Sequence, residues 1–189
     1  MPIPRCRLRS LGVLLLGLTS GPLAAAEQPV QVLEMTSSVP ADWVLDIPDS
    51  DMRLTQFRIP ARVDNDGTDG DGAEFVVFYF GPDQGGSVEA NVARWVSQFS
   101  NPDGTPVEPL IERLETPMPA TLVQLQGSYA RGIGMGPVGD PLPDRMLLAA
   151  VVETPAGTLY PQLHGPAALV TAQRPAFIAF IAGLQRPGH

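Results

Sequence analysis

The residues best placed for chemistry form a glycine-rich turn, Gly85-Gly86-Ser87, between an apolar run and a segment with helical apolar spacing. Strand, glycine loop and helix is the arrangement that binds phosphate groups. A phosphate loop also needs a lysine, but the chain has none, and Asp83 would repel an anion. Ser87 and Glu89 instead fit a helix N-cap, because a hydroxyl accepts from an orphan N–H and a carboxylate interacts favourably with the helix dipole. We expect a capped helix here, with anion binding as the alternative.

A second glycine-rich loop, residues 131–143, formally matches the dinucleotide-binding pattern at Gly134, Gly136 and Gly139. That pattern binds a pyrophosphate only when a helix follows it. Three prolines interrupt the segment and exclude a helix: Pro137, Pro141 and Pro143. We interpret the match as fortuitous and leave open whether the loop borders a cleft.

The acidic loop, residues 64–71, could offer carboxylate ligands to Ca²⁺ from four side chains: Asp64, Asp66, Asp69 and Asp71. The spacing is not that of an EF-hand, because Asp69 stands where the sixth position requires glycine and the twelfth position is not acidic. Asp-Gly pairs also make ordinary turns. We therefore expect a solvated turn and keep a Ca²⁺ site as the alternative.

Other side chains that could support catalysis are few. The two histidines are His164 and the terminal His189, which cannot form a metal cluster by themselves. No serine lies in a Gly-x-Ser-x-Gly elbow, and the single cysteine, Cys6, lies near the N-terminus. The sequence therefore predicts no catalytic, cofactor-binding or metal-ligating residue.

Residues 1–26 have the three parts of a secretory signal peptide. Arg5, Arg7 and Arg9 precede an apolar run, Leu11 to Leu18, and small residues end the segment at Ala26. The apolar run is shorter than the roughly 20 residues that span a membrane. We expect residues 27–189 to form a single domain, periplasmic or secreted, that lacks disulfides because Cys6 is removed with the leader.

All 12 basic residues are arginine, against 20 acidic residues, and the formal net charge is −8. The predicted leader contains three of those arginines, so the remaining domain is more acidic still. An acidic domain repels nucleic acids and anionic lipids, which excludes both as expected partners. The partner is expected to be an unknown envelope protein or a small ligand.

Strands are predicted in runs, with helices between and after them. Residues 52–60 and 73–80 indicate strands, the second nearly continuous in apolar residues and therefore buried on both faces. A helix after Ser87 places apolar residues on one face: Val88, Val92, Trp95, Val96 and Phe99. Residues 120–129 alternate as a strand does, and a turn at 154–157 joins two further strands.

The last of these strands contains Pro161, which predicts an edge position or a bulge because proline cannot donate to a ladder. A terminal helix follows, in which Pro175 is expected to cause a kink or a restart. Strands in runs favour an α+β fold with a central antiparallel sheet, flanked by helices on both sides.

Three segments resemble a group of uncharacterised exported bacterial proteins: "MRLTQFRIP", "FYFGPDQGGSVEANVARWVSQF" and "LHGPAALV…AFIAFIAGLQ". The likeness covers most of residues 40–185, although the acidic loop and Pro175 depart from the pattern. More distantly, the order of segments is similar to the PsbP-like and Mog-like α+β fold, which includes photosystem II extrinsic subunits, a Ran-binding protein and bacterial envelope proteins. The resemblance implies a central antiparallel sheet flanked by helices, and it assigns no catalytic residue to this chain.

Together these patterns predict an exported, non-catalytic binding or accessory protein. The alternative is a small hydrolase or a Ca²⁺-dependent module that uses the acidic loop. An enzyme should bring His164 or paired carboxylates into one concave pocket, whereas a binding module should show an exposed apolar patch.

Export predicts a defined N-terminus for the mature protein. Ala24 and Ala26 satisfy the small-residue requirement of the cleavage site, so Glu27 should be the first residue. N-terminal sequencing of protein recovered from the periplasm or the medium checks this. Recovered material that still begins at Met1 would contradict it.

Overall fold

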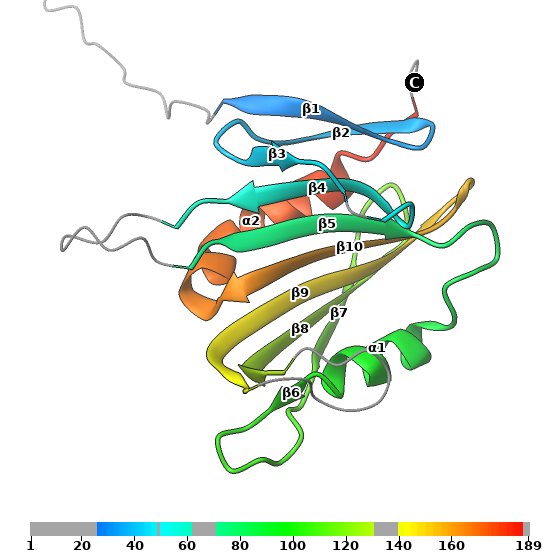
Figure 1. The fold of residues 1–189 in the computed structure, drawn as a ribbon. Coiled ribbons are helices and arrows are strands. Elements are labelled where there is room, and N and C mark those ends of the chain that lie inside the picture. The colour runs from blue at the N-terminus through cyan, green and yellow to red at the C-terminus, as the bar shows by residue number, and fades with distance from the viewer. Residues whose placement is uncertain (1–25, 49, 62–70, 131–139, 187–189) are drawn as a thin grey trace, which may run out of the picture.

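The computed structural model describes residues 26–48, 50–61, 71–130 and 140–186 (Figure 1). Its main element is an eight-stranded antiparallel sheet with the strand order β3-β4-β5-β10-β9-β8-β6, in which β7 also pairs with β8. The strands are β3 (Val44–Asp46), β4 (Arg53–Ile59), β5 (Ala73–Tyr79), β6 (Phe99–Ser100), β7 (Leu110–Leu114), β8 (Ala120–Tyr129), β9 (Leu142–Thr154) and β10 (Gly157–Pro166). The predicted α+β fold with a central antiparallel sheet is confirmed.

Strand β9 contributes to hydrophobic cores on both faces of this sheet. Successive side chains of a strand point to opposite faces. Met146, Leu148, Ala150 and Val152 accordingly join one core, and the residues between them join the other. A strand of this kind needs a covering layer on each side, because an uncovered apolar face would remain in water.

The first core is covered by helix α2 (Ala167–Ala182) and by a hairpin of β1 (Glu27–Val32) and β2 (Met35–Pro40). Phe75 of β5 packs edge-on against Phe177 and Phe180 of α2, with ring centroids 6.0 and 5.0 Å apart. The hairpin is tied to the chain that follows α2 by two backbone hydrogen bonds between Thr36 and Gln185, of 2.9 and 3.0 Å. The C-terminal end of the described chain therefore lies beside the turn end of this hairpin in Figure 1.

The second core lies on the opposite face, beneath helix α1 (Val88–Val96). Trp95 of α1 and Phe99 of β6 are buried with Val123 and Leu125 of β8 and Tyr160 of β10. The helix begins as predicted: the Ser87 hydroxyl accepts a hydrogen bond from the Ala90 N–H at 3.2 Å. The expectation that helices cover both faces of the sheet is confirmed.

Four local predictions need correction. Phe99 lies in β6 and not in α1, because the helix ends at Val96. The glycine-rich loop predicted at residues 131–143 ends before Leu142, because β9 begins there and contains Pro143. Pro161 lies in a central strand, where pairing with β9 is interrupted after Leu159 and resumes in the same register at Gln162. Pro175 lies inside one continuous helix, so it does not mark a restart.

Burial of α1 against the sheet predicts a ranking of two substitutions. Trp95→Ala should lower the free energy of unfolding by about 3–5 kcal/mol, the usual loss for a buried large aromatic side chain. Ser87→Ala should cost only about 1 kcal/mol, the typical value of an N-cap. Urea denaturation of both variants measures the difference. A larger loss for Ser87→Ala than for Trp95→Ala would contradict a packing role for this helix.

Candidate functional site

The glycine turn before α1 is explained by backbone geometry and packing. Gly85 and Gly86 have φ values of +100° and +79°, a region that other residues rarely adopt. A Cβ atom at Gly85 would lie 2.3 Å from the Tyr160 hydroxyl oxygen, which no side chain could tolerate. The prediction of a capped helix is confirmed, and the glycines serve the close approach of the turn to β10.

Electrostatics at the same helix start disfavour an anion bound to its backbone N–H groups. The pKa of Glu89 is lowered by a hydrogen bond from its own backbone N–H and by another from Ser87. A carboxylate therefore already uses the positive end of the helix dipole. An anion at that point would be repelled by Glu89.

A hollow of about 480 Å³ lies beside the glycine turn and along one flank of α1, and we call it the α1 hollow. It is lined by Phe80, Gln84, Gly85, Gly86, Ala90, Asn91 and Arg94. Asn91 is buried, and its Nδ2 donates to the carbonyls of Gly85 at 2.8 Å and Ser87 at 2.9 Å. Its Oδ1 accepts a hydrogen bond from Nη2 of Arg94. The buried amide thus links the turn to the arginine.

Sequence reasoning missed both Asn91 and Arg94. A signal for Asn91 was present, because this residue interrupts the apolar stripe three positions after Val88 and four before Trp95. A polar residue inside an apolar helix face is normally hydrogen-bonded when buried. The partners of Asn91 could not be identified from spacing alone.

The second feature is an exposed apolar surface at one edge of the sheet, which we call the edge surface. β3 is the outermost strand on that side. Four large apolar side chains of β3 and the turn into β4 are exposed by the following fractions: Val44 43%, Leu45 65%, Ile47 88% and Met52 51%. A hollow of about 730 Å³ adjoins them, lined by Pro48, Ser50, Asp51, Met52 and Arg53.

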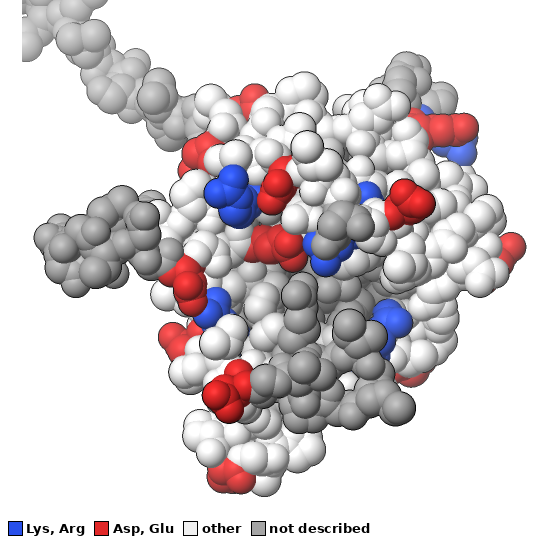
Figure 2. All heavy atoms as spheres, in the orientation of Figure 1, with Lys and Arg blue, Asp and Glu red and all other residues white. Residues whose placement is uncertain are grey.

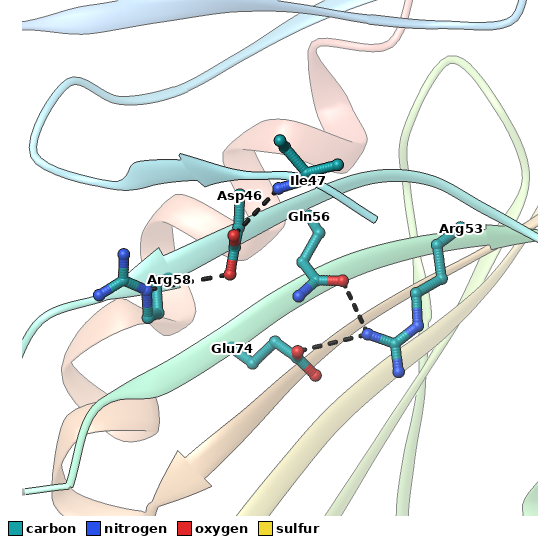
Figure 3. Close-up of polar contacts among 6 residues, drawn as sticks. All are labelled: Asp46, Ile47, Arg53, Gln56, Arg58 and Glu74. Atoms are coloured by element: carbon teal, nitrogen blue, oxygen red, sulfur yellow. Dashed lines mark hydrogen bonds and ion pairs between the residues drawn. The ribbon is translucent and has the colours of Figure 1, made fainter. Parts of the chain in front are cut away.

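Polar contacts fix the strands beside the edge surface (Figure 3). Asp46 accepts a hydrogen bond from the Ile47 N–H at 3.0 Å and lies 3.9 Å from Nε of Arg58 on β4. Arg53 donates from Nη1 to Gln56 at 2.7 Å and to Glu74 of β5 at 3.3 Å. The exposed Asp46–Arg58 pair contributes little stability, so the position of β3 depends mainly on its backbone pairing with β4.

Figure 2 shows acidic and basic atoms interspersed over this region rather than gathered by sign. The guanidinium of Arg53 also lies over the ring of Phe78, 5.3 Å from its centroid. A surface of mixed charge with exposed apolar side chains is typical of a protein-binding area and not of a nucleic-acid-binding one.

The candidate histidine lies away from both hollows. His164 is in β10, between Glu74 of β5 and Leu147 of β9, so the expected edge position is wrong. Its ring lies 4.1 Å from the ring of Tyr129 and 6.3 Å from that of Phe99, measured between centroids. It contributes to the lining of neither hollow. His189 lies outside the described residues.

Most of the two predicted loops also lies outside the described residues, including Asp64, Asp66, Asp69 and the glycines at 134, 136 and 139. Asp71 is described and forms an ion pair with Arg145 of β9. β9 begins at Leu142, so a strand and not a helix follows, and the last two residues of the predicted glycine-rich loop belong to that strand. Within the described ranges, no three His, Cys, Asp or Glu side chains gather as metal ligands would.

Comparison with known proteins identifies the fold. No family model and no curated protein matches the chain. The solution structure of cyanobacterial PsbP (CyanoP) from Synechocystis sp. PCC 6803 is similar, with a TM-score of 0.50 and 13% identity over 90% of this chain and 98% of that one. A crystal structure of a Pseudomonas aeruginosa protein of unknown function gives a TM-score of 0.46 and 17% identity, over 85% and 98% of the two chains.

The distant resemblance to PsbP-like proteins is therefore confirmed at the level of the fold. Among the described helices, none has the length and apolar character required to cross a membrane. Fold similarity at this identity carries no residue roles to the present chain, since one fold supports many functions.

The ion pair of Asp71 with Arg145 leads to a prediction for the acidic loop. A guanidinium beside the loop opposes the binding of a cation there. Replacing Asp66 and Asp69 together by asparagine should therefore change the free energy of unfolding by no more than about 0.5 kcal/mol, as for ordinary surface positions. Millimolar Ca²⁺ should not raise the melting temperature of the parent protein. A Ca²⁺-dependent increase that the double variant loses would establish the alternative.

Proposed function

We propose that residues 27–189 form one exported domain that acts as a non-catalytic accessory protein and binds a protein partner through its edge surface. The observation that carries this proposal is the exposure of Val44, Leu45, Ile47 and Met52 along one edge of the sheet. Exposed apolar area is unfavourable in water by about 25 cal/mol per Å², and clusters of exposed apolar side chains are typical of interaction sites.

The position of this surface supports a protein as the partner. An edge strand presents backbone groups that no neighbouring strand pairs, and proteins normally protect such edges. β3 is short and carries Asp46 near Arg58, two features that hinder unspecific strand pairing at this edge. The apolar side chains next to the charged pair resemble the apolar centre and polar rim of a transient interface.

The arrangement of titratable groups supports a binding role over hydrolysis. Hydrolysis by acid–base chemistry needs a base and an acid that converge on one concave site. His164 packs against Tyr129 and Phe99, whereas the hollow beside the edge surface contains Asp51 and Arg53 but no histidine. The nearby charged groups are engaged with each other, as Arg53 is with Glu74.

The test compares two matched pairs of exposed apolar residues. Leu45→Glu with Ile47→Glu alters the edge surface, and Leu110→Glu with Ile111→Glu alters β7, where the side chains are 62% and 51% exposed. Both variants should retain the parent stability within about 0.5 kcal/mol, because the altered side chains lie in solvent. Each protein is immobilised and exposed to an envelope fraction, and the bound proteins are quantified by mass spectrometry.

We expect a protein that the parent and the β7 variant retain in equal amounts and the edge variant loses. The same protein, once purified, should bind the parent directly and not the edge variant. Equal retention by all three proteins would contradict a role for the edge surface. If only the β7 variant failed to retain the protein, the interface would lie at the β7 edge of the sheet and not at β3.

A further inference from the structure

The α1 hollow has features of a ligand site that are independent of the edge surface. We propose that it binds a small organic anion, a carboxylate attached to an apolar or aromatic body. The guanidinium of Arg94 would hold the carboxylate, and Phe80 would contact the apolar part. This inference goes beyond the proposed partner binding, because the residues involved lie on α1 and at the end of β5.

The charge of Arg94 is the first argument. Four other arginines form ion pairs with carboxylates: Arg53, Arg58, Arg145 and Arg174. Arg94 contacts the neutral amide of Asn91 instead. Within the described residues, Arg113 and Arg186 also lack an ion pair, but neither lines a hollow. Arg94 therefore places a positive charge in the α1 hollow, and no carboxylate of the described residues forms an ion pair with it. The rest of the domain is acidic.

The orientation of Arg94 is the second argument. Both hydrogens of the Asn91 amide are directed to backbone carbonyls, of Gly85 and Ser87. The amide orientation leaves Oδ1 of Asn91 as an acceptor. This oxygen accepts a hydrogen bond from Nη2 of Arg94. A guanidinium has five N–H donors in a planar fork that matches a carboxylate. One contact to Asn91 positions this fork and leaves donors for a ligand, so Asn91 is a positioning residue.

The shape and lining of the hollow define the rest of the ligand. A volume of about 480 Å³ is within the range of roughly 300–1,000 Å³ that is usual for small-molecule sites. The Phe80 ring is held by Phe78, stacked at an interplanar angle of 3°, and by Tyr160, edge-on at 5.4 Å. An aromatic ring and a cation that line the same hollow favour a ligand with an apolar body and a negative charge.

The N-terminus of α1 does not form this site. Its first turn is already satisfied by the Ser87 hydroxyl and by Glu89. Glu89 is not among the residues that line the hollow. The proposed contacts therefore come from the side chain of Arg94 and the ring of Phe80, which can be changed without removing the cap of the helix.

The test uses three probes on the domain that begins at Glu27: benzoate, its uncharged analogue benzamide, and acetate. Two-dimensional NMR titration follows the amide signals of the turn and of α1. We expect benzoate to shift the signals of residues that line the hollow, and to bind more tightly than either other probe. Equal affinity for benzamide would overturn the role of the charge, and equal affinity for acetate would overturn the role of Phe80.

Substitutions then identify the cation. Arg94→Gln should weaken benzoate binding by about tenfold or more, because a charge-assisted hydrogen-bonded contact is lost. Arg94→Lys should bind with intermediate affinity, since it retains the charge without the planar fork. Arg113→Gln is the matched control and should bind as the parent does, as should the edge variant. An unchanged affinity in Arg94→Gln, with a parent-like spectrum that shows it is folded, would refute the site.

Discussion

The burial of β9 on both of its faces determines the architecture. Met146 to Val152 supply apolar side chains alternately to two cores, so neither face of the sheet centre can remain in water. One face is covered by α2 and the N-terminal hairpin, and the other by α1. The two layers are built differently: α2 follows directly from β10, whereas α1 is reached through a tight glycine turn that must pass the Tyr160 hydroxyl. α1 lies where it does because the second face of the sheet also needs a covering layer. The α1 hollow follows from that position of the helix.

The two candidate surfaces occur where this covering is incomplete. The nine residues of α1 cover the second core near β8 and β6, and the flank of the helix leaves Asn91, Arg94 and Phe80 around a hollow. At the other side of the sheet, the order of strands ends at β3, beyond which no further strand of the sheet is described. Leu45 and Ile47 are exposed there, in the last strand of the sheet and directly after it. Both surfaces therefore result from the geometry of packing and need no unusual backbone strain beyond the glycine turn.

Sequence reasoning succeeded where the signal was local. The apolar runs that became β5 and β9, the Ser87 cap and the turn at residues 154–157 each depend on neighbours within a few positions, and the antiparallel α+β fold followed from their order. It failed where the answer depended on distant pairing. Pro161 predicted an edge position or a bulge because proline cannot donate. Its strand is central, and its pairing with β9 is interrupted at Pro161 without a change of register. The exposure of Leu45 and the partners of Asn91 also depend on which segments meet in three dimensions, and the apolar pattern of a short strand does not contain that information.

The pairing of Thr36 with Gln185 joins the beginning of the domain to its end. An isolated two-stranded hairpin is at best marginally stable, so β1 and β2 depend on α2 and the residues after it for their packing. A ribosome releases the N-terminal part of the chain first, and that part then waits for almost the whole domain before its final contacts can form. If residues 1–26 direct export, this delay has a practical value. A polypeptide that must pass through a narrow channel in an extended state cannot form this contact early, because Gln185 follows Thr36 by almost the length of the domain.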